Sequence, residues 1–236
     1  MNTPHVVVLT GAGISAESGV PTFRDSDGLW EGHRVEDVAT PQGFARDPEL
    51  VHSFYDARRA ALASVQPNPA HRALARLEDV LGDDLLVVTQ NIDDLHERAG
   101  SARVLHMHGE LLSALCRVCE ARTRWEGDLG DRPPCPSCAA PALRPDVVWF
   151  GEIPYEMDRI FEALESCELF VSVGTSGAVY PAAGFVEAAR TYGARTLELN
   201  LQASEGSWLF DESRRGPAGT LVPAWVDEIL ERTQRA

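Results

Sequence analysis

Four of the five cysteines stand in two closely spaced pairs. Cys116 and Cys119 form the first pair, Cys135 and Cys138 the second, with residues 120–134 between them. Two C-x-x-C pairs at this separation supply the tetrahedral thiolate set of a zinc site. Because all four ligands come from the protein, no coordination position stays open. We therefore expect one structural zinc ion rather than a catalytic one.

A glycine-rich turn follows the first apolar run of the chain. Residues 6–9 are typical of a buried parallel strand, and Gly11, Ala12 and Gly13 come soon after them. A strand, a glycine turn and the start of a helix present backbone N–H groups to an anion, which favours a pyrophosphate site. The spacing departs from the usual G-x-G-x-x-G fingerprint, because the third glycine is Gly19. On spacing alone, a plain structural turn stays open beside a nucleotide site.

Polar residues stand at the ends of five predicted strands. In an open α/β sheet, ligands bind outside the carboxyl ends of the strands. One polar strand end is ordinary turn chemistry, whereas five together predict a single binding site. No acidic residue ends a second strand, so we expect Asn200 or its neighbours to contact an adenosine ribose. The five ends are Thr10 with Gly11, then Gln90, Asn91, Ile92 and Asp93, then His108, then Gly174, Thr175 and Ser176, and finally Asn200.

Taken together, these stretches resemble the sirtuin family of NAD-dependent protein-lysine deacylases. The resemblance covers almost the whole chain, in order, and its motifs are highly specific in combination. It implies NAD as the co-substrate, one structural zinc ion, and acyl-lysine proteins as substrates. The stretches that carry it are residues 11–15 and 19–24, residues 89–93, His108 with Gly109, the two cysteine pairs, residues 148–152 and residues 174–176.

The resemblance also implies roles for single residues. His108 would be the general base, since an imidazole titrates near neutral pH; the alternative is a buried core histidine. His106 is expected to face away from the site. Asn91 and Asp93 would orient the nicotinamide and its ribose. Further NAD contacts would come from Gly11, Ala12, Gly13, Ser15, Glu17, Thr22, Phe23, Arg24, Trp30, Gln90, Ile92, Gly174, Thr175, Ser176, Asn200, Leu201, Gln202 and Ala218.

The irregular glycine spacing is explained by the loop that carries Phe23 and Arg24. In the family, the acyl oxygen attacks the nicotinamide ribose carbon, nicotinamide departs, and the acyl group ends on ADP-ribose. Moving the third glycine to Gly19 lengthens the loop that carries Phe23 and Arg24. By the resemblance, Phe23 would shield the side that nicotinamide leaves, and Arg24 would help to fix phosphate or ribose.

Tyr55 and Arg58 suggest a preference for acidic acyl groups. They are spaced i, i+3 on a helix predicted to begin after Asp47 and to run to about Val65, so they share one face. A phenol beside a guanidinium suits a carboxylate. The alternative interpretation, which is commoner for a helix of unknown function, is that the aromatic packs beside the apolar face and the arginine is solvated. Residues 54–59 resemble sirtuins that remove acidic acyl groups, which implies desuccinylase activity beside deacetylase activity.

A second substrate contact follows from the resemblance. The extended stretch of Val148, Trp149, Phe150 and Gly151 would pair with the substrate peptide as an added strand. Recognition of this kind uses the peptide backbone and tolerates many sequences.

Composition limits the partners and the location. The net charge of −15 over 236 residues disfavours binding to nucleic acid, which needs a basic surface. All 21 basic residues are arginine, so the chain has no lysine side chain that could itself be acylated. No apolar run is long enough to span a membrane, and no basic stretch precedes an apolar run at the start. We expect no membrane association, no signal peptide, a cytoplasmic location and a monomer.

Alternating strand and helix patterns predict an α/β fold with a Rossmann-like parallel sheet and helices on both faces. A small zinc-binding and helical subdomain completes the prediction. The chain would form one deacylase domain, with a core of about residues 1–30, 67–110 and 148–236. The subdomain would combine residues 31–66 and 111–147.

Three other functions stay open from the sequence. A hydride-transferring NAD oxidoreductase with a zinc module is disfavoured by the glycine spacing and by the missing acidic ribose contact. A mono-ADP-ribosyltransferase would use the same reactive intermediate. A non-catalytic NAD sensor is disfavoured because His108, Asn91 and Asp93 are all present.

Overall fold

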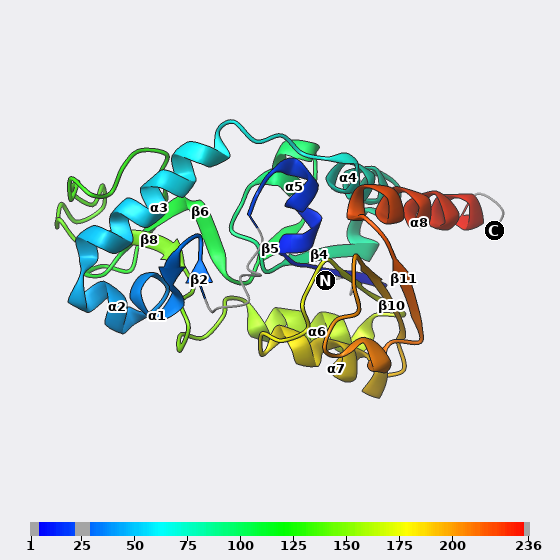
Figure 1. The fold of residues 1–236 in the computed structure, drawn as a ribbon. Coiled ribbons are helices and arrows are strands. Elements are labelled where there is room, and N and C mark those ends of the chain that lie inside the picture. Colours follow the sequence, from blue (N-terminus) through cyan, green and yellow to red (C-terminus); the bar gives the residue numbers. More distant parts are fainter. Residues whose placement is uncertain (1–4, 22–28, 234–236) are drawn as a thin grey trace.

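The computed structural model describes residues 5–21 and 29–233. The predicted NAD contacts Thr22, Phe23 and Arg24 lie outside these ranges. A six-stranded parallel sheet organises the fold, in the order β11-β10-β9-β1-β4-β5 (Figure 1). Its strands are β1 (Val6–Thr10), β4 (Leu85–Thr89), β5 (Val104–His106), β9 (Leu169–Val173), β10 (Arg195–Asn200) and β11 (Glu212–Arg215).

Helices cover both faces of this sheet (Figure 1). Because side chains alternate along a strand, Val8 contributes to the core under α4 (Pro69–Leu81) and α8 (Ala218–Thr233). Its neighbours Val7 and Leu9 contribute to the core under α6 (Met157–Ser166) and α7 (Phe185–Thr191). The predicted fold class, a Rossmann-like parallel sheet between two helical layers, is confirmed.

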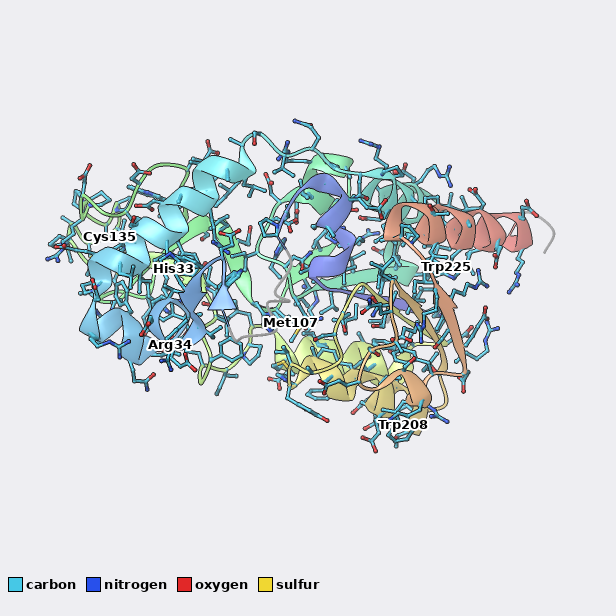
Figure 2. The ribbon with its side chains drawn as sticks, in the orientation of Figure 1. His33, Arg34, Met107, Cys135, Trp208 and Trp225 are labelled. Carbon is cyan, nitrogen blue, oxygen red and sulfur yellow. The ribbon has the colours of Figure 1, made fainter. Side chains whose placement is uncertain are left out.

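A smaller lobe lies beside the sheet and ends in the cysteine-containing loops. Figure 2 places Cys135 at the end of this lobe that is farthest from Trp225 on α8. It has a third apolar core of its own. The exact division into core and subdomain stays a prediction. The lobe contains β2 (Leu29–Trp30), β3 (His33–Arg34), α1 (Val35–Val38), α2 (Pro41–Arg46), α3 (Pro48–Leu62), and the antiparallel sheet of β6 (Gly109–Cys116), β7 (Arg122–Arg124) and β8 (Leu143–Val147).

Side-chain caps fix the starts of the helices near the site. The Asp47 carboxylate accepts a hydrogen bond from the backbone N–H of Leu50, and Pro48 takes the first position of α3. Asn68 and His71 form a reciprocal capping box at the start of α4. Helix α3 begins where the sequence predicts, although it ends at Leu62, before the predicted end near Val65. The sequence predicts the second helix over residues 71–81, and α4 begins two residues earlier, at Pro69.

The structure differs from the sequence prediction in three further places. The sequence predicts a closing helix over residues 225–232, but α8 begins at Ala218, and its first turns include Pro223, a residue type disfavoured inside a helix. The helix expected after the glycine turn is a pair of short 3-10 turns, η1 (Ala12–Ile14) and η2 (Ala16–Ser18). The extended stretch at residues 147–150 is a strand only at Val147.

The remaining elements connect these layers. Helix α5 (Leu95–Ala99) follows β4 and packs against α4. Short 3-10 turns are η3 (Gly82–Asp84), η4 (Ala182–Gly184) and η5 (Ser207–Leu209). Within the described ranges, none of the helices combines the length and apolar character needed to cross a membrane.

Candidate active site

A cavity of about 390 Å³ lies where the carboxyl edge of the parallel sheet meets the smaller lobe. Both sides contribute predicted site residues to it. The sheet side supplies Gly11, Ala12, Gly13, Gln90, Asn91, Ile92, Asp93, His108, Gly174, Thr175 and Ser176. The lobe side supplies Trp30, Tyr55, Arg58, Val148, Trp149, Phe150 and Gly151.

The glycine turn after β1 packs directly onto the loop after β9. The N–H of Gly13 donates to the carbonyl oxygen of Gly174 at 2.8 Å. A Cβ on Gly11 would lie 2.9 Å from that oxygen, and one on Gly13 would lie 2.7 Å from the Gly174 Cα. Glycine is therefore required at both positions by the close approach of two backbones, which places the two loops side by side at the edge of the cavity.

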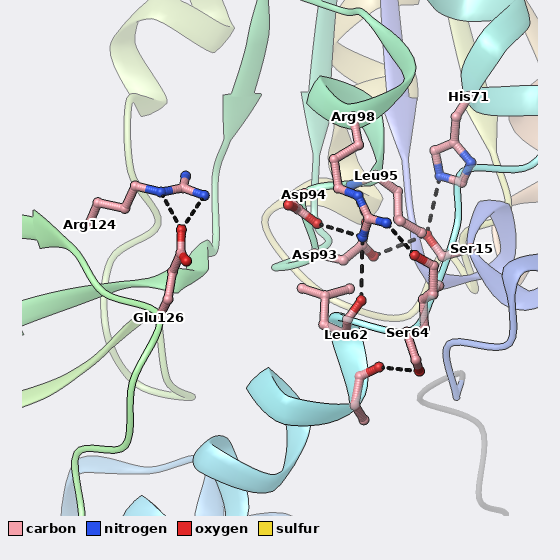
Figure 3. Close-up of polar contacts among 12 residues, drawn as sticks. Ser15, Leu62, Ser64, His71, Asp93, Asp94, Leu95, Arg98, Arg124 and Glu126 are labelled. Carbon is pink, nitrogen blue, oxygen red and sulfur yellow. Dashed lines mark hydrogen bonds and ion pairs between the residues drawn. The ribbon is translucent and has the colours of Figure 1, made fainter.

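A buried hydrogen-bond network joins the glycine turn to the loop after β4. The hydroxyl of Ser15 donates to Asp93 Oδ2 at 3.0 Å and accepts from Asn91 Nδ2 at 3.2 Å. Figure 3 shows His71 of α4 reaching the same hydroxyl, at 3.4 Å through Nε2. Burial raises the pKa of Asp93, and hydrogen bonds from the Leu95 N–H and Ser15 oppose this shift. Ser15 thus lies behind the cavity wall and holds two residues that line it.

His71 is the member of this network that lies farthest from the cavity, and the sequence pattern did not identify it. Its Nδ1 accepts from the backbone N–H of Asn68 at 3.3 Å, so Nε2 carries the hydrogen that points to Ser15. Burial lowers the pKa of His71 to about 4. The ring is neutral near pH 7 and acts as a fixed donor rather than a charge.

His108 lies two residues beyond the end of β5 and lines the cavity. Its Nδ1 is 3.0 Å from the carbonyl oxygen of Gln90. Because a carbonyl only accepts, Nδ1 carries the hydrogen and Nε2 is the basic nitrogen. Burial lowers the pKa of His108, and the hydrogen bond to Gln90 opposes the shift only in part. A neutral imidazole with an unprotonated nitrogen meets the chemical requirement for a general base.

His106 has the opposite character, although it is only two residues away. It lines a separate hollow of about 200 Å³. Its Nδ1 lies 3.1 Å from the carbonyl oxygen of Asn91, and Nε2 lies 2.8 Å from Glu97 Oε1. Burial would lower the pKa of His106, but the Glu97 carboxylate reverses this, so the pKa is raised overall. His106 faces away from the cavity as expected, because β5 ends there and the chain turns before His108.

Tyr55 and Arg58 lie together on the cavity-facing side of α3. The Tyr55 hydroxyl accepts a hydrogen bond from Trp149 Nε1 at 3.1 Å. Burial raises the pKa of Tyr55, so the phenol stays protonated. The Arg58 guanidinium lies over the rings of Trp30 and Phe54, with 4.2 Å and 4.0 Å to the ring centroids. The alternative interpretation of Arg58 as a solvated surface arginine is wrong, since its side chain is only 10% exposed.

The stretch after β8 passes along the same cavity. The N–H of Val148 donates to the carbonyl of His108, and that of Phe150 donates to the carbonyl of Ala39. The N–H of Trp149 donates to Glu152 Oε2 at 2.8 Å. These three donors are therefore committed within the chain. The Trp149 carbonyl accepts in turn from the N–H of Glu152 at 2.9 Å, whereas Gly151 has open space where a Cβ would lie. Pairing of this stretch with a peptide stays a prediction.

The four predicted zinc ligands meet at the far end of the lobe. All four sulfur atoms lie within 4.8 Å of one another. The Cys116–Cys138 and Cys119–Cys135 sulfur pairs are each separated by 3.7 Å. A tetrahedron of thiolates about 2.3 Å from a zinc ion has edges of about 3.8 Å. Backbone N–H groups of Cys119 and Val118 lower the pKa of Cys116 to about 6, which favours the thiolate that zinc binds. The cluster suits a zinc ion.

A buried ion pair fastens this cysteine module to α3. Asp56 accepts hydrogen bonds at 3.0 Å from the N–H groups of Leu129 and Gly130. Arg59 donates to Asp56 at 2.6 Å and to the carbonyl of Leu111 at 3.0 Å. The sequence gives no local sign of this connection, because its partners are far apart along the chain.

Several predicted NAD contacts do not reach the cavity in this structure. The Asn200 amide donates to the carbonyl of Thr175 at 2.6 Å and accepts from the N–H of Leu201 at 2.9 Å. Glu17 accepts from the N–H of Gly219 at 2.8 Å, in the first turn of α8. Residues outside the cavity lining are Ser15, Glu17, Asn200, Leu201, Gln202 and Ala218. Their roles stay predictions.

Known proteins resemble this chain over nearly its full length. An NAD-dependent protein deacylase of Escherichia coli (strain K12) is 57% identical over 234 residues, covering 98% of this chain and 84% of the relative. Its counterpart from Salmonella typhimurium is also 57% identical, covering 98% and 86%. A Sir2 homolog solved with NAD superposes with a TM-score of 0.88 at 40% identity, covering 98% of this chain and 91% of that one. Sir2Af2 bound to a myristoylated histone peptide gives 0.75 at 33%, covering 100% and 94%.

The structure combines a parallel sheet, whose carboxyl edge is of the kind that binds nucleotides, with a lobe that carries a four-cysteine metal site. One cavity lies between the two parts, and this combination defines a class of α/β proteins. Within that class, residues 11–181 match the Sir2 family. Together with the relatives above, this match shows that the chain belongs to the Sir2 family.

Proposed function

We propose that this chain is an NAD-dependent protein-lysine deacylase that removes both acetyl and succinyl groups. The family and the near full-length similarity to NAD-dependent protein deacylases support the deacylase activity. The observation that carries the proposal is that His108, Tyr55 and Arg58 line one cavity. A neutral base and a carboxylate-binding pair then flank the same substrate.

The sheet edge suits NAD. The glycine turn after β1 and the loop after β9 face the cavity with little side chain, which lets a pyrophosphate approach the backbone. NAD supplies the ADP-ribose that takes up the acyl group, and nicotinamide is released. His108 Nε2 takes a ribose hydroxyl proton, and Asn91 and Asp93 orient the nicotinamide end. The reaction needs both walls of the cavity, so the chain works as one deacylase domain.

The lobe side binds the acylated peptide. Residues 148–151 pair with the peptide backbone, which lets one site accept many protein sequences. Tyr55 and Arg58 receive the far end of the acyl chain. Among the described residues, the Tyr55 hydroxyl hydrogen has no acceptor, and Tyr55 is fully buried at the cavity wall, so a succinyl carboxylate must enter deeply to accept from it.

The test uses one peptide in acetylated and succinylated forms, incubated with NAD and analysed by mass spectrometry. The wild type should release nicotinamide and acyl-ADP-ribose from both forms. Tyr55→Phe with Arg58→Met should reduce desuccinylation by about a hundredfold and deacetylation far less. Equal loss of both activities would contradict the acidic-acyl assignment. Reduced nicotinamide would indicate hydride transfer, and ADP-ribosylated peptide would indicate ADP-ribosyl transfer.

A further inference from the structure

Arg58 already has a carboxylate partner inside the cavity. Glu31, in the turn between β2 and β3, forms an ion pair with Arg58 and lines the same cavity. Figure 2 shows His33 of this hairpin beside α3, and its ring lies 5.3 Å from that of Phe54. The hairpin therefore brings a negative charge to the guanidinium that a succinyl group would need.

Burial explains why this counter-charge is needed. The Arg58 side chain is only 10% exposed and packs against two aromatic rings that contact each other. A buried guanidinium without a partner is costly, so an empty or acetyl-filled cavity requires a carboxylate from the protein. An acidic acyl chain brings a second carboxylate to the same cation. Arg214 holds both Glu212 and Glu228, but that cluster is more exposed to water. Around the buried Arg58, two like charges repel each other with less screening, which favours the withdrawal of one carboxylate.

Glu31 is the partner that can withdraw. Its side chain is 37% exposed, against 10% for Arg58. The next residue, Gly32, has φ +79 and no atom near the position of a Cβ, so the turn has open space around it. Arg58 is instead confined by the Trp30 and Phe54 rings. The cation stays in place, and Glu31 is the group that an incoming carboxylate displaces.

We propose that Glu31 stands in for the carboxylate of an acidic acyl chain, and that its displacement from Arg58 sets the ratio of acidic to neutral acyl groups that the enzyme removes. The proposal rests on the acyl-lysine site assigned above. It explains how one cavity serves both classes. A neutral acyl group leaves the Glu31–Arg58 pair intact, whereas an acidic one replaces it.

The test compares three acyl groups on one peptide in the wild type and in Glu31→Gln. The groups are acetyl, succinyl and succinamoyl, the last being a neutral amide of the same size as succinyl. Removal of the Glu31 charge should raise the succinyl-to-acetyl ratio of kcat/KM about tenfold, mainly through a lower KM for succinyl. The succinamoyl-to-acetyl ratio should stay level, because the effect depends on charge and not on size.

Glu36→Gln is the matched control. Glu36 follows the same hairpin and pairs with Arg34 at 3.5 Å, but its side chain is 68% exposed and outside the cavity lining. It should leave all three ratios as in the wild type. Thermal melting of both variants shows whether either substitution perturbs the fold.

Three outcomes separate this proposal from the assigned function. An unchanged or lowered succinyl-to-acetyl ratio in Glu31→Gln overturns the role of Glu31. An equal gain for succinyl and succinamoyl also overturns it, because the barrier would then be steric. A wild type that leaves succinyl-lysine intact while Glu31→Gln removes it supports Glu31 and contradicts only the assignment of desuccinylation to the native enzyme.

Discussion

The two walls of the cavity are held together in different ways. On the sheet side, Ser15, Asn91 and Asp93 are all buried and bonded to one another. On the lobe side, Arg58 pairs with a partly exposed Glu31 on a hairpin turn. The members of the network are held by one another away from water, whereas the Glu31 carboxylate is partly exposed and can leave the buried Arg58. Under the proposed function, the chemistry common to all acyl groups lies on the fixed wall, and the choice of acyl group lies on the adjustable one.

Zinc removal should have the largest effect on the structure and should separate the two walls. The four-thiolate cluster holds the cysteine loops at the end of the lobe, whereas the sheet has two apolar cores and no part in the cluster. Strong chelation should unfold the lobe and lower deacylation at least about a hundredfold, with the helical signal of the sheet layers retained. Circular dichroism and activity before and after chelation, and again after zinc addition, measure this.

Two cysteine variants provide the control for that experiment. Cys119→Ala removes a zinc ligand and should lower the zinc content, whereas Cys167→Ala changes a buried cysteine outside the cluster and should retain it. Full activity and unchanged melting in metal-free protein would show that the lobe does not depend on the metal.

His108→Ala should remove the proposed general base from the fixed wall. Loss of the neutral Nε2 base should reduce kcat/KM about a thousandfold for acetyl and succinyl substrates alike. Zinc content and melting should stay as in the wild type, because the ring makes only one hydrogen bond among those described, to Gln90. Nicotinamide release with matched peptides measures the loss.

His106→Gln serves as the comparison for that variant, since His106 faces a separate hollow. It should lose far less activity than His108→Ala. If His108→Ala lost less than tenfold in activity, or lost activity toward only one acyl group, another residue would be the general base.

The sequence predicts the fixed wall better than the adjustable one. The sequence predicts strands over residues 169–173 and 195–200 and a helix over residues 95–99, because each pattern lies within its own short segment. Strands β9 and β10 and helix α5 have these bounds. Four of the five polar strand ends line one cavity as expected, since parallel strands share one carboxyl edge, whereas Asn200 at the fifth lies outside the lining. The cysteine pairs also converge, because metal-ligand spacing is local within each pair.

The contacts that distinguish the lobe are long-range and leave no such pattern. Glu31 and Arg58 lie on separate elements, and each is an ordinary charged residue in its own segment. Asp56 holds loop residues far along the chain, again without a local sign. The early start of α8 is missed for a related reason: packing against α4 supports first turns that include Pro223, ahead of the predicted residues 225–232.

Ser15→Ala should weaken the fixed wall without removing a group from the cavity. It deletes the hydroxyl that bonds Asn91, Asp93 and His71, and leaves buried polar groups without a partner. We expect kcat to fall about tenfold for both acyl groups, with their ratio unchanged. Ser18→Ala is the matched control from the next turn, where the hydroxyl only accepts from Asn68. A changed acyl ratio in Ser15→Ala would show that the two walls are coupled.

The pH dependence of kcat/KM should distinguish the two neighbouring histidines. A base works in its unprotonated form, so the rate rises with pH through the pKa of the base and then levels off. Burial lowers the pKa of His108, which places this rise below pH 6.5. For His106, the Glu97 carboxylate outweighs burial and raises the pKa, so a rise governed by that ring would lie above 6.5. Profiles of the wild type and His106→Gln should coincide below 6.5. A rise above pH 6.5 that disappears in His106→Gln would identify His106, rather than His108, as the base. The base would then lie outside the cavity, and the contrast between its two walls would not hold.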